Sequence, residues 1–149
     1  MAVTASGLFV QTFLDVLDTT QLALDLDLET HKVAMFTNSI TPDFQADTAY
    51  GAAPYNANEV SGTGYSAGGV VLTSTALSSA TGTITWDGAD TSWASSTITN
   101  ARCALIYADA LAGNNAICLV NFGNDYSTTN GTFTIQWNGS GIFTWDLTP

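Results

Sequence analysis

The sequence predicts an all-β domain, a β-sandwich or a jelly-roll-like barrel, with a short helix or arm at the N-terminus. Roughly seven or eight short segments alternate apolar and polar residues, and clusters of Gly, Asn, Asp and Ser separate them. Charged residues make up only 10% of the 149 residues, whereas hydrophobic residues make up 46%. That apolar content is sufficient for one core, so we expect a single folded domain.

The N-terminal segment, residues 1–30, is expected to be a helix or arm that precedes a β domain over residues 31–149. Apolar residues spaced three and four apart between 7 and 17 predict a short amphipathic helix, with Ser6 as its cap. From 22 to 29, leucine occupies every second position. This alternation predicts a half-buried strand or a transition from helix to strand.

The β domain is expected to begin with a strongly apolar strand at 31–39, which ends in turn residues. Further strand patterns follow at 69–77, 81–88, 91–109 and 116–123. Residues 42–69 contain many glycines and no periodicity. A loop of this length in a compact domain is typically functional or covered by a partner.

The last twenty residues alternate bulky and polar side chains on both sides of Asn138-Gly139. An Asn-Gly pair between two alternating runs predicts a β-hairpin with a tight turn. Its bulky residues are expected to form the inner face of the sandwich: Phe133, Ile135, Trp137, Phe143, Trp145 and Leu147.

The charge balance excludes several classes of partner. The net charge is −11, and the only basic residues are Lys32 and Arg102. Nucleic-acid binding requires Lys and Arg to neutralise phosphates, so direct contact with nucleic acid is not expected. The same surface repels anionic membranes. The sequence shows no signal peptide and no apolar run of membrane-spanning length, so we expect assembly in a cytoplasm.

Residues that carry catalytic or metal chemistry are few. His31 is the only histidine, and it is expected to be an exposed or turn residue rather than a general base. Asp25, Asp27 and Glu29 lie two apart; a solvated or partner-facing edge is favoured over calcium binding or paired-carboxylate catalysis. Asp87 and Asp90 are typical turn residues. We expect no enzymatic activity, no cofactor and no metal.

The tryptophans and cysteines are expected to have structural roles. Tryptophan at alternating strand positions is ordinary core or interface material, which is favoured over a sugar-binding platform: Trp86, Trp93, Trp137 and Trp145. Cys103 and Cys118 have apolar neighbours, so buried free thiols are favoured over a disulfide across a hairpin. Arg102 is expected either to pair with a carboxylate or to lie exposed.

Three blocks of the chain, in order, resemble a family of small structural proteins of tailed bacteriophages. The shared features are a Thr-Pro start, an NEV-GTGY-AGG loop, a W-SSTI-AR segment and an FG-D-S-NGTFTI-W-GIFT ending. The resemblance covers about residues 31–147 and is weaker over the first thirty residues. It implies a non-enzymatic virion protein, and within that class a capsid decoration (cement) protein on the outside of the head.

The resemblance implies two partners, the major capsid protein and further copies of this chain. A short apolar helix is marginal alone in water, so the N-terminal helix is expected to dock onto another subunit, with the tyrosines of the 42–69 loop as second anchors. The expected contact residues are Leu8, Phe9, Phe13, Tyr50, Tyr55 and Tyr65. The alternatives are a tail, fibre-associated or head-tail joining protein and, less favoured, a carbohydrate-binding module.

Overall fold

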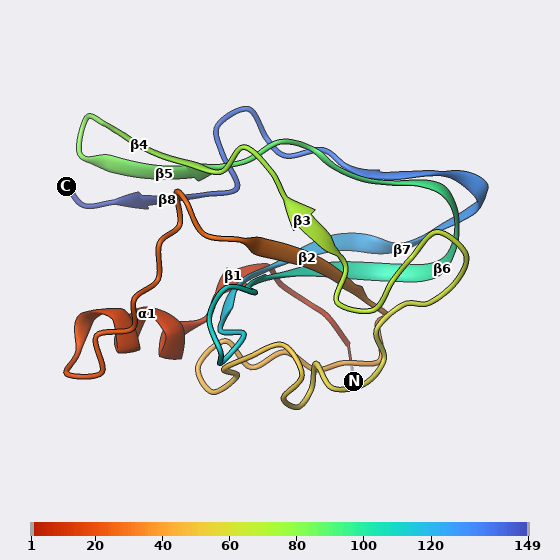
Figure 1. Cartoon of the computed structure of the whole chain (residues 1–149), viewed down its shortest axis with the longest axis horizontal. Helices are drawn as coiled ribbons and strands as arrows, with labels where there is room; N and C mark the ends of the chain where they lie inside the picture. Colours follow the sequence, from red (N-terminus) through yellow and green to blue (C-terminus); the bar gives the residue numbers. More distant parts are fainter. Residues whose placement is uncertain (1, 149) are drawn as a thin grey trace.

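The computed structural model describes residues 2–148 and confirms an all-β sandwich with one short N-terminal helix (Figure 1). A five-stranded antiparallel sheet has the order β1-β7-β6-β2-β3, and a three-stranded sheet has the order β4-β5-β8. The elements are β1 (Gly7–Leu8), α1 (Val10–Leu17), β2 (His31–Phe36), β3 (Val70–Leu72), β4 (Ala76–Ala80), β5 (Thr83–Asp87), β6 (Thr91–Ala108), β7 (Ala116–Ile135) and β8 (Phe143–Asp146).

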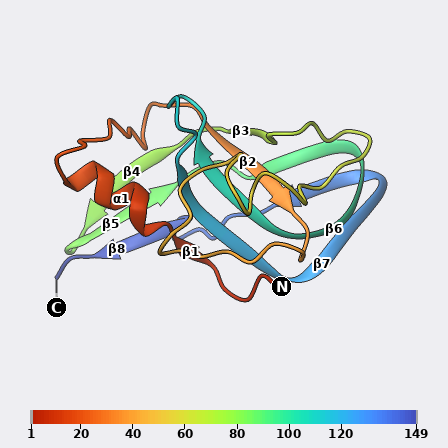
Figure 2. The same cartoon turned by 90° about the horizontal axis from the view of Figure 1, so that it is seen from below.

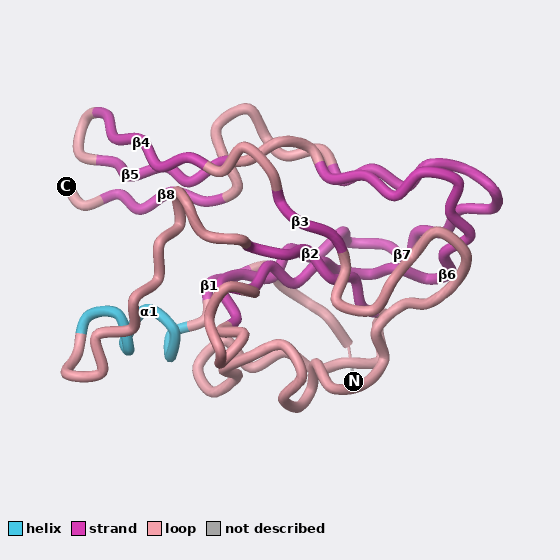
Figure 3. Tube along the Cα trace, viewed as in Figure 1, coloured by secondary structure: helices cyan, strands magenta, loops and turns pink. Residues whose placement is uncertain are grey.

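The strands β6 and β7 form one long hairpin that doubles back on itself and contributes to both layers. Its closed end pairs Tyr107 with Ala116, and its open end pairs Thr91 with Ile135. Figures 1 and 3 show the pair running through one layer, bending at the edge of the molecule and returning through the other.

Residues with positive φ lie on both strands where the hairpin bends. They are Ser95, Asn100, Gly123 and Asn130, with φ of 50°, 56°, 80° and 50°. The pairing register of β6 and β7 shifts several times between Trp93 and Cys103. Bulges of this kind bend a strand and increase its twist, so they account for the change of layer.

The five-stranded sheet is buried on both faces. On β2, Val33 and Met35 face the space between the layers, and Ala34 and Phe36 face the opposite side. The loop over 37–69 crosses that opposite side, as Figure 2 shows from below. A strand covered on both faces needs apolar residues on both sides, which explains why β2 is apolar at every position from Val33 to Phe36.

Residues at several points between 3 and 26 pack into this core. Val3 and Phe9 belong to the buried cluster under the loop, and Leu26 belongs to the cluster between the layers. The arm and the β domain are therefore one folded unit.

The expected helix over 7–17 is shorter than predicted and is not capped by Ser6. Gly7 and Leu8 pair with Leu119 and Cys118 as β1, so the helix begins only at Val10. The Ser6 hydroxyl instead accepts a hydrogen bond from the Asn121 backbone N–H at 2.9 Å.

Residues 22–29 form a loop with a turn between α1 and β2, so of the two expected structures the strand is wrong and the transition from helix to strand is found. The Asp25 carboxylate accepts hydrogen bonds from the backbone N–H groups of Asp27 and Leu28, at 2.9 and 3.0 Å. Such an Asx turn competes with a strand ladder. Leu26 is buried, whereas Leu28 is 86% exposed, so the leucines do not share one buried face.

The expected C-terminal hairpin is also wrong, because its two halves pair with different strands. Residues up to Ile135 belong to β7 and pair with β6, whereas Phe143–Asp146 is β8 and pairs with β5. Asn138 does form a turn, in which the Gly141 N–H donates to its carbonyl at 2.8 Å. That turn joins two sheets. Of the six bulky residues only Phe133 and Ile135 are buried, and Leu147 is 68% exposed.

Alanine substitutions at two glycines of the 42–69 loop, Gly69 and Gly51, test how closely this loop approaches the sheet. Gly69 and Gly51 both have positive φ, 73° and 86°, but a Cβ at Gly69 would collide with the Val33 carbonyl, whereas one at Gly51 would meet nothing within 4 Å. We expect Gly69→Ala to lower the free energy of unfolding by about 3 kcal/mol or more and Gly51→Ala by about 1 kcal/mol, measured by urea denaturation. Equal losses would contradict this packing.

Candidate functional site

The tyrosines expected as contact anchors instead hold the 42–69 loop against the sheet, through Glu59. Its carboxylate accepts hydrogen bonds from the Tyr50 hydroxyl at 2.9 Å, the Tyr65 hydroxyl at 2.7 Å and the Gly68 N–H at 2.8 Å. The Tyr65 hydroxyl also accepts from the Met35 N–H on β2 at 2.9 Å. Glu59 is half-buried, and a carboxylate with three donors is well satisfied, so this cluster is structural.

The burial of these tyrosines changes their expected role. Tyr55 is only 2% exposed and donates its hydroxyl proton to Asp47 at 3.1 Å, so it has no surface to offer a partner. Tyr50 and Tyr65 are half-buried. Burial and the Glu59 carboxylate raise the pKa of Tyr50 to about 12, which keeps its phenol protonated as a donor. Tyr55 is therefore not a contact residue. Tyr50 and Tyr65 offer a partner only the exposed part of each side chain.

The N-terminal residues expected to contact a subunit face the interior of their own chain. Phe9 is fully buried and packs against Phe44 and Tyr55. Phe13 packs against Trp145 of β8, with ring centroids 4.8 Å apart, and Leu8 packs against the core between the layers. Phe9 is therefore not a contact residue, and Leu8 and Phe13 are largely occupied within the chain.

The opposite face of α1 is apolar and exposed. Val10, Leu14 and Leu17 follow one another at i, i+4 and i+7, and they are 43%, 48% and 85% exposed. On the inner face, the Thr12 hydroxyl donates to the Ala116 carbonyl at 2.6 Å. A surface helix normally turns its apolar stripe toward the core and its polar residues toward solvent, whereas α1 also exposes apolar residues. We call Val10, Leu14 and Leu17 the α1 stripe.

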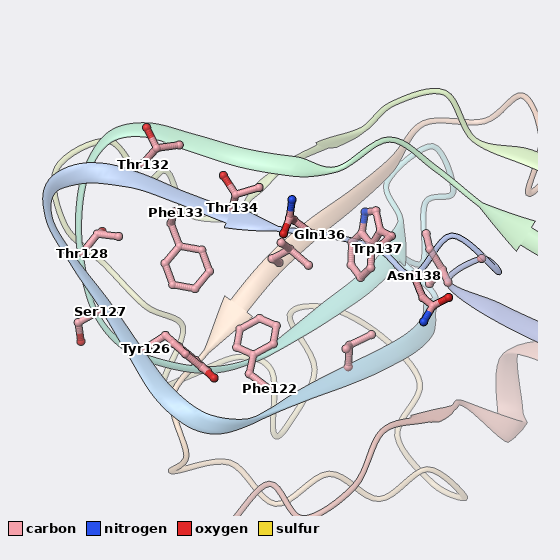
Figure 4. A pocket seen from close by; sticks show the side chains of 14 residues that line it. Phe122, Tyr126, Ser127, Thr128, Thr132, Phe133, Thr134, Gln136, Trp137 and Asn138 are labelled. Atoms are coloured by element: carbon pink, nitrogen blue, oxygen red, sulfur yellow. The ribbon is translucent and has the colours of Figure 1, made fainter.

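A second feature is a cleft between the two halves of the bent strand β7, which we call the β7 cleft (Figure 4). It has a volume of about 590 Å³. The apolar side chains that line it are Val120, Phe122, Tyr126, Phe133, Ile135 and Trp137. Tyr126 is 48% exposed at its rim, 6.3 Å from Phe122 between ring centroids. Sequence analysis missed the cleft because it depends on the bend in β7.

His31 is buried, contrary to the expectation of an exposed or turn residue. Its ring packs edge-on against Trp86, with Nε2 3.1 Å from the Asp25 carbonyl. That contact makes Nε2 the protonated nitrogen, and Nδ1 is buried without a partner. Burial lowers the pKa of His31, although nearby acidic groups partly oppose the effect.

Asp25 and Asp27 accept hydrogen bonds from backbone N–H groups, one within the turn and the other on β4. Asp25 forms the turn described above, and the Asp27 carboxylate accepts from the Leu77 N–H at 2.7 Å. Among residues 2–148, no group of three or more His, Cys, Asp or Glu side chains is arranged to hold a metal ion.

The remaining polar and aromatic residues mostly match their expected roles. Cys103 and Cys118 are buried free thiols, and burial raises the pKa of each to about 12. Arg102 pairs with Asp125 at 2.8 Å, and Lys32 pairs with Asp109 at 3.1 Å. Trp86 and Trp93 are core residues, whereas Trp137 and Trp145 are half-buried.

Comparisons with known proteins give no relative from which to transfer a function. No family model, no curated protein and no solved structure matches the chain. In the part of the chain that the structure describes, no helix has the length and apolar character needed to cross a membrane.

The burial of His31 predicts a pH dependence of stability. Its pKa is lowered in the folded state, so the unfolded chain binds the proton more tightly, and folding loses stability as the pH falls below the ordinary value of 6.5. We expect the midpoint temperature of unfolding to fall between about pH 7.5 and pH 5.5, and to fall less in His31→Gln. Because the chain has a single histidine, equal pH dependence in the two proteins would refute this assignment.

Proposed function

We propose that this protein is a non-enzymatic structural component of a bacteriophage virion, a decoration protein bound in many copies to the outside of the head. The resemblance of residues 31–147 to phage structural proteins suggests the class. The α1 stripe is the observation that carries the proposal, because it leaves an apolar helix face uncovered.

The charge of the chain indicates what covers the α1 stripe. The net charge is −11, and both basic side chains are already paired with carboxylates. Two copies brought together through this face would repel each other, whereas an apolar patch rimmed by Lys and Arg would be attracted. We therefore assign the stripe to a surface of the major capsid protein with that character. Neighbouring copies of the chain on the head are then held in place by the array of major capsid proteins to which each copy binds.

The proposal fits the way the loop and the charges are arranged. The 42–69 loop is held by the Glu59 cluster, so it does not need a partner in order to fold. An acidic surface keeps the free protein soluble at the high concentration that a multi-copy component requires. It also repels the DNA inside the head, which favours an exterior position.

A binding experiment with matched variants tests the proposal. In Leu14→Gln/Leu17→Gln the stripe loses its apolar groups but keeps helix propensity and net charge. We expect this variant to bind phage heads that lack the protein about tenfold more weakly than wild type, in a co-sedimentation assay. Leu14→Lys/Leu17→Lys should bind more weakly still, because the rim of the partner is basic.

The control is Ser78→Gln/Asn124→Gln, which changes two exposed polar residues outside α1. Ser78 pairs with Thr85, and Thr85 pairs with Thr144, so Ser78 lies on the face of its sheet opposite to Trp145, the residue that packs against α1. The control should bind like wild type, and the circular dichroism spectra of all variants should match. If the stripe variants bind heads as well as the control does, the stripe is not the contact. If wild type binds tails or necks but not heads, the head assignment is wrong.

A further inference from the structure

The sandwich is closed on the β6 side and open on the β7 side. Residues 62–64 lie against the outer edge of β6, where the Thr97 N–H donates to the Thr63 carbonyl at 2.8 Å. Within residues 2–148, the stretch of β7 from Phe122 to Ile135 pairs with β6 alone. Where the pairing with β6 is regular, as from Phe133 to Ile135, alternate residues therefore direct their N–H and C=O away from β6, next to the β7 cleft. Near the bulges this alternation is interrupted, and the Gly123 N–H donates to the Asn121 side chain at 2.9 Å.

We propose that the β7 cleft binds an extended segment of another protein. The segment adds to the free edge of β7 as a further strand and inserts apolar side chains from alternate positions between the two layers. Main-chain hydrogen bonds and side-chain pockets are the two parts of this mode of recognition. The site is separate from the α1 stripe, and the proposal does not depend on the virion role.

The interior of the cleft suits apolar side chains better than a sugar. In Figure 4 the rings of Phe122, Phe133 and Trp137 turn toward a common space, whereas the side chains of Thr132 and Thr134 point away from it. The indole N–H of Trp137 already donates to the Ala89 carbonyl at 3.0 Å. A sugar needs several polar groups that converge on it, and the inward-facing groups are mainly carbon.

The first part of the same edge already accepts an extended segment. Gly7 and Leu8 pair antiparallel with Leu119 and Cys118, and this short strand ends where the Ser6 hydroxyl accepts from the Asn121 N–H. Beyond Asn121 the edge continues without a covering strand. An added segment would therefore extend an arrangement that β1 begins.

Charge again selects the occupant. The cleft is lined by no Asp, Glu, Lys, Arg or His side chain, so the inserted residues are neutral. The chain as a whole carries −11, which favours a segment with Lys or Arg at its ends over a segment from a second acidic copy. The occupant is thus a neutral alternating strand with basic flanks, from a different protein.

Designed peptides test this site on the full-length chain. The probe is acetyl-Lys-Thr-Val-Thr-Val-Thr-Val-Lys-amide, and its control, acetyl-Lys-Thr-Thr-Thr-Val-Val-Val-Lys-amide, has the same composition without alternation. Binding is followed by amide chemical shifts in nuclear magnetic resonance spectra. We expect the alternating peptide to shift residues lining the cleft between 120 and 142, and to bind about tenfold more tightly than the control.

Two N-methylated versions separate strand addition from simple apolar contact. One is methylated at every Val nitrogen and the other at every Thr nitrogen. An added strand turns only one of these sets toward β7, so one version should bind and the other should not. If both bind equally, the free edge takes no part and the proposal fails.

A matched pair of variants tests the residues. Tyr126→Ser removes the exposed ring at the rim of the cleft, and Asn124→Ser changes an exposed residue of the same strand that does not line the cleft. Tyr126→Ser should weaken peptide binding about tenfold, and Asn124→Ser should leave it unchanged. Equal affinities would contradict the assignment.

Three other outcomes overturn the proposal. Maltotriose that shifts the cleft residues when the peptides do not would indicate a carbohydrate site. Shifts of the same residues on concentrating the protein alone would indicate a second copy as the occupant. Absence of any peptide-induced shift would leave the edge without a strand-binding role.

Discussion

The doubling back of the β6–β7 hairpin is the constraint on which the rest of the structure depends. One end of the hairpin lies in the sheet that pairs with β1 and β2, and the other end lies in the opposite layer. The two layers therefore share the same pair of strands, and their separation is set by the bend. The β7 cleft exists because β7 passes through both layers. Residues 62–64 cover the outer edge of β6, but they do not cover the outer edge of β7.

Because the hairpin folds back over only one face of the five-stranded sheet, the 42–69 loop has to cover the other face. The lower half of the hairpin, with β2, forms a sheet whose second face has no other sheet to cover it. The loop covers that face, and the Glu59 carboxylate links three of its groups, two tyrosine hydroxyls and one backbone N–H. Irregular backbone can cover an apolar face only when its polar groups find partners. Here the Val60 N–H donates to the Met35 carbonyl at 2.9 Å, and the Tyr50 N–H donates to the Asn114 carbonyl at 3.0 Å.

Sequence patterns predicted the parts of the fold in which local periodicity decides the structure. The strand at β2 and the long pattern at 91–109 were found because each contains a buried apolar run, at Val33–Phe36 and at Cys103–Ala108, and because the first part of β6 alternates buried and exposed residues. The strand predicted at 22–29 failed because the side chain of Asp25 satisfies the backbone locally. The C-terminal hairpin failed because periodicity shows which residues share a face but not which strand is the partner: Ile135 pairs with Thr91, and Phe143 pairs with Trp86.

The candidate site was predicted only in part, for a related reason. An apolar N-terminal helix was expected to carry contacts, and α1 does have an uncovered face. The prediction assigned the wrong residues to the outer face of the helix. Apolar residues occur on both the inner and the outer face of α1, so the sequence does not show which face meets the core. Phe9 and Phe13 face inward, and Leu14 faces outward. The β7 cleft lies between two halves of one strand, and no local pattern shows that a strand will bend.

The proposed virion role predicts how many copies of the protein a phage particle carries, which can be counted. The most direct measurement is quantitative gel densitometry of purified phage particles, with the major capsid protein as the internal standard. A decoration protein should be present at roughly one copy for every one to three copies of the major capsid protein. A trace ratio would place the protein in the tail or neck, and its absence from purified particles would contradict a virion role.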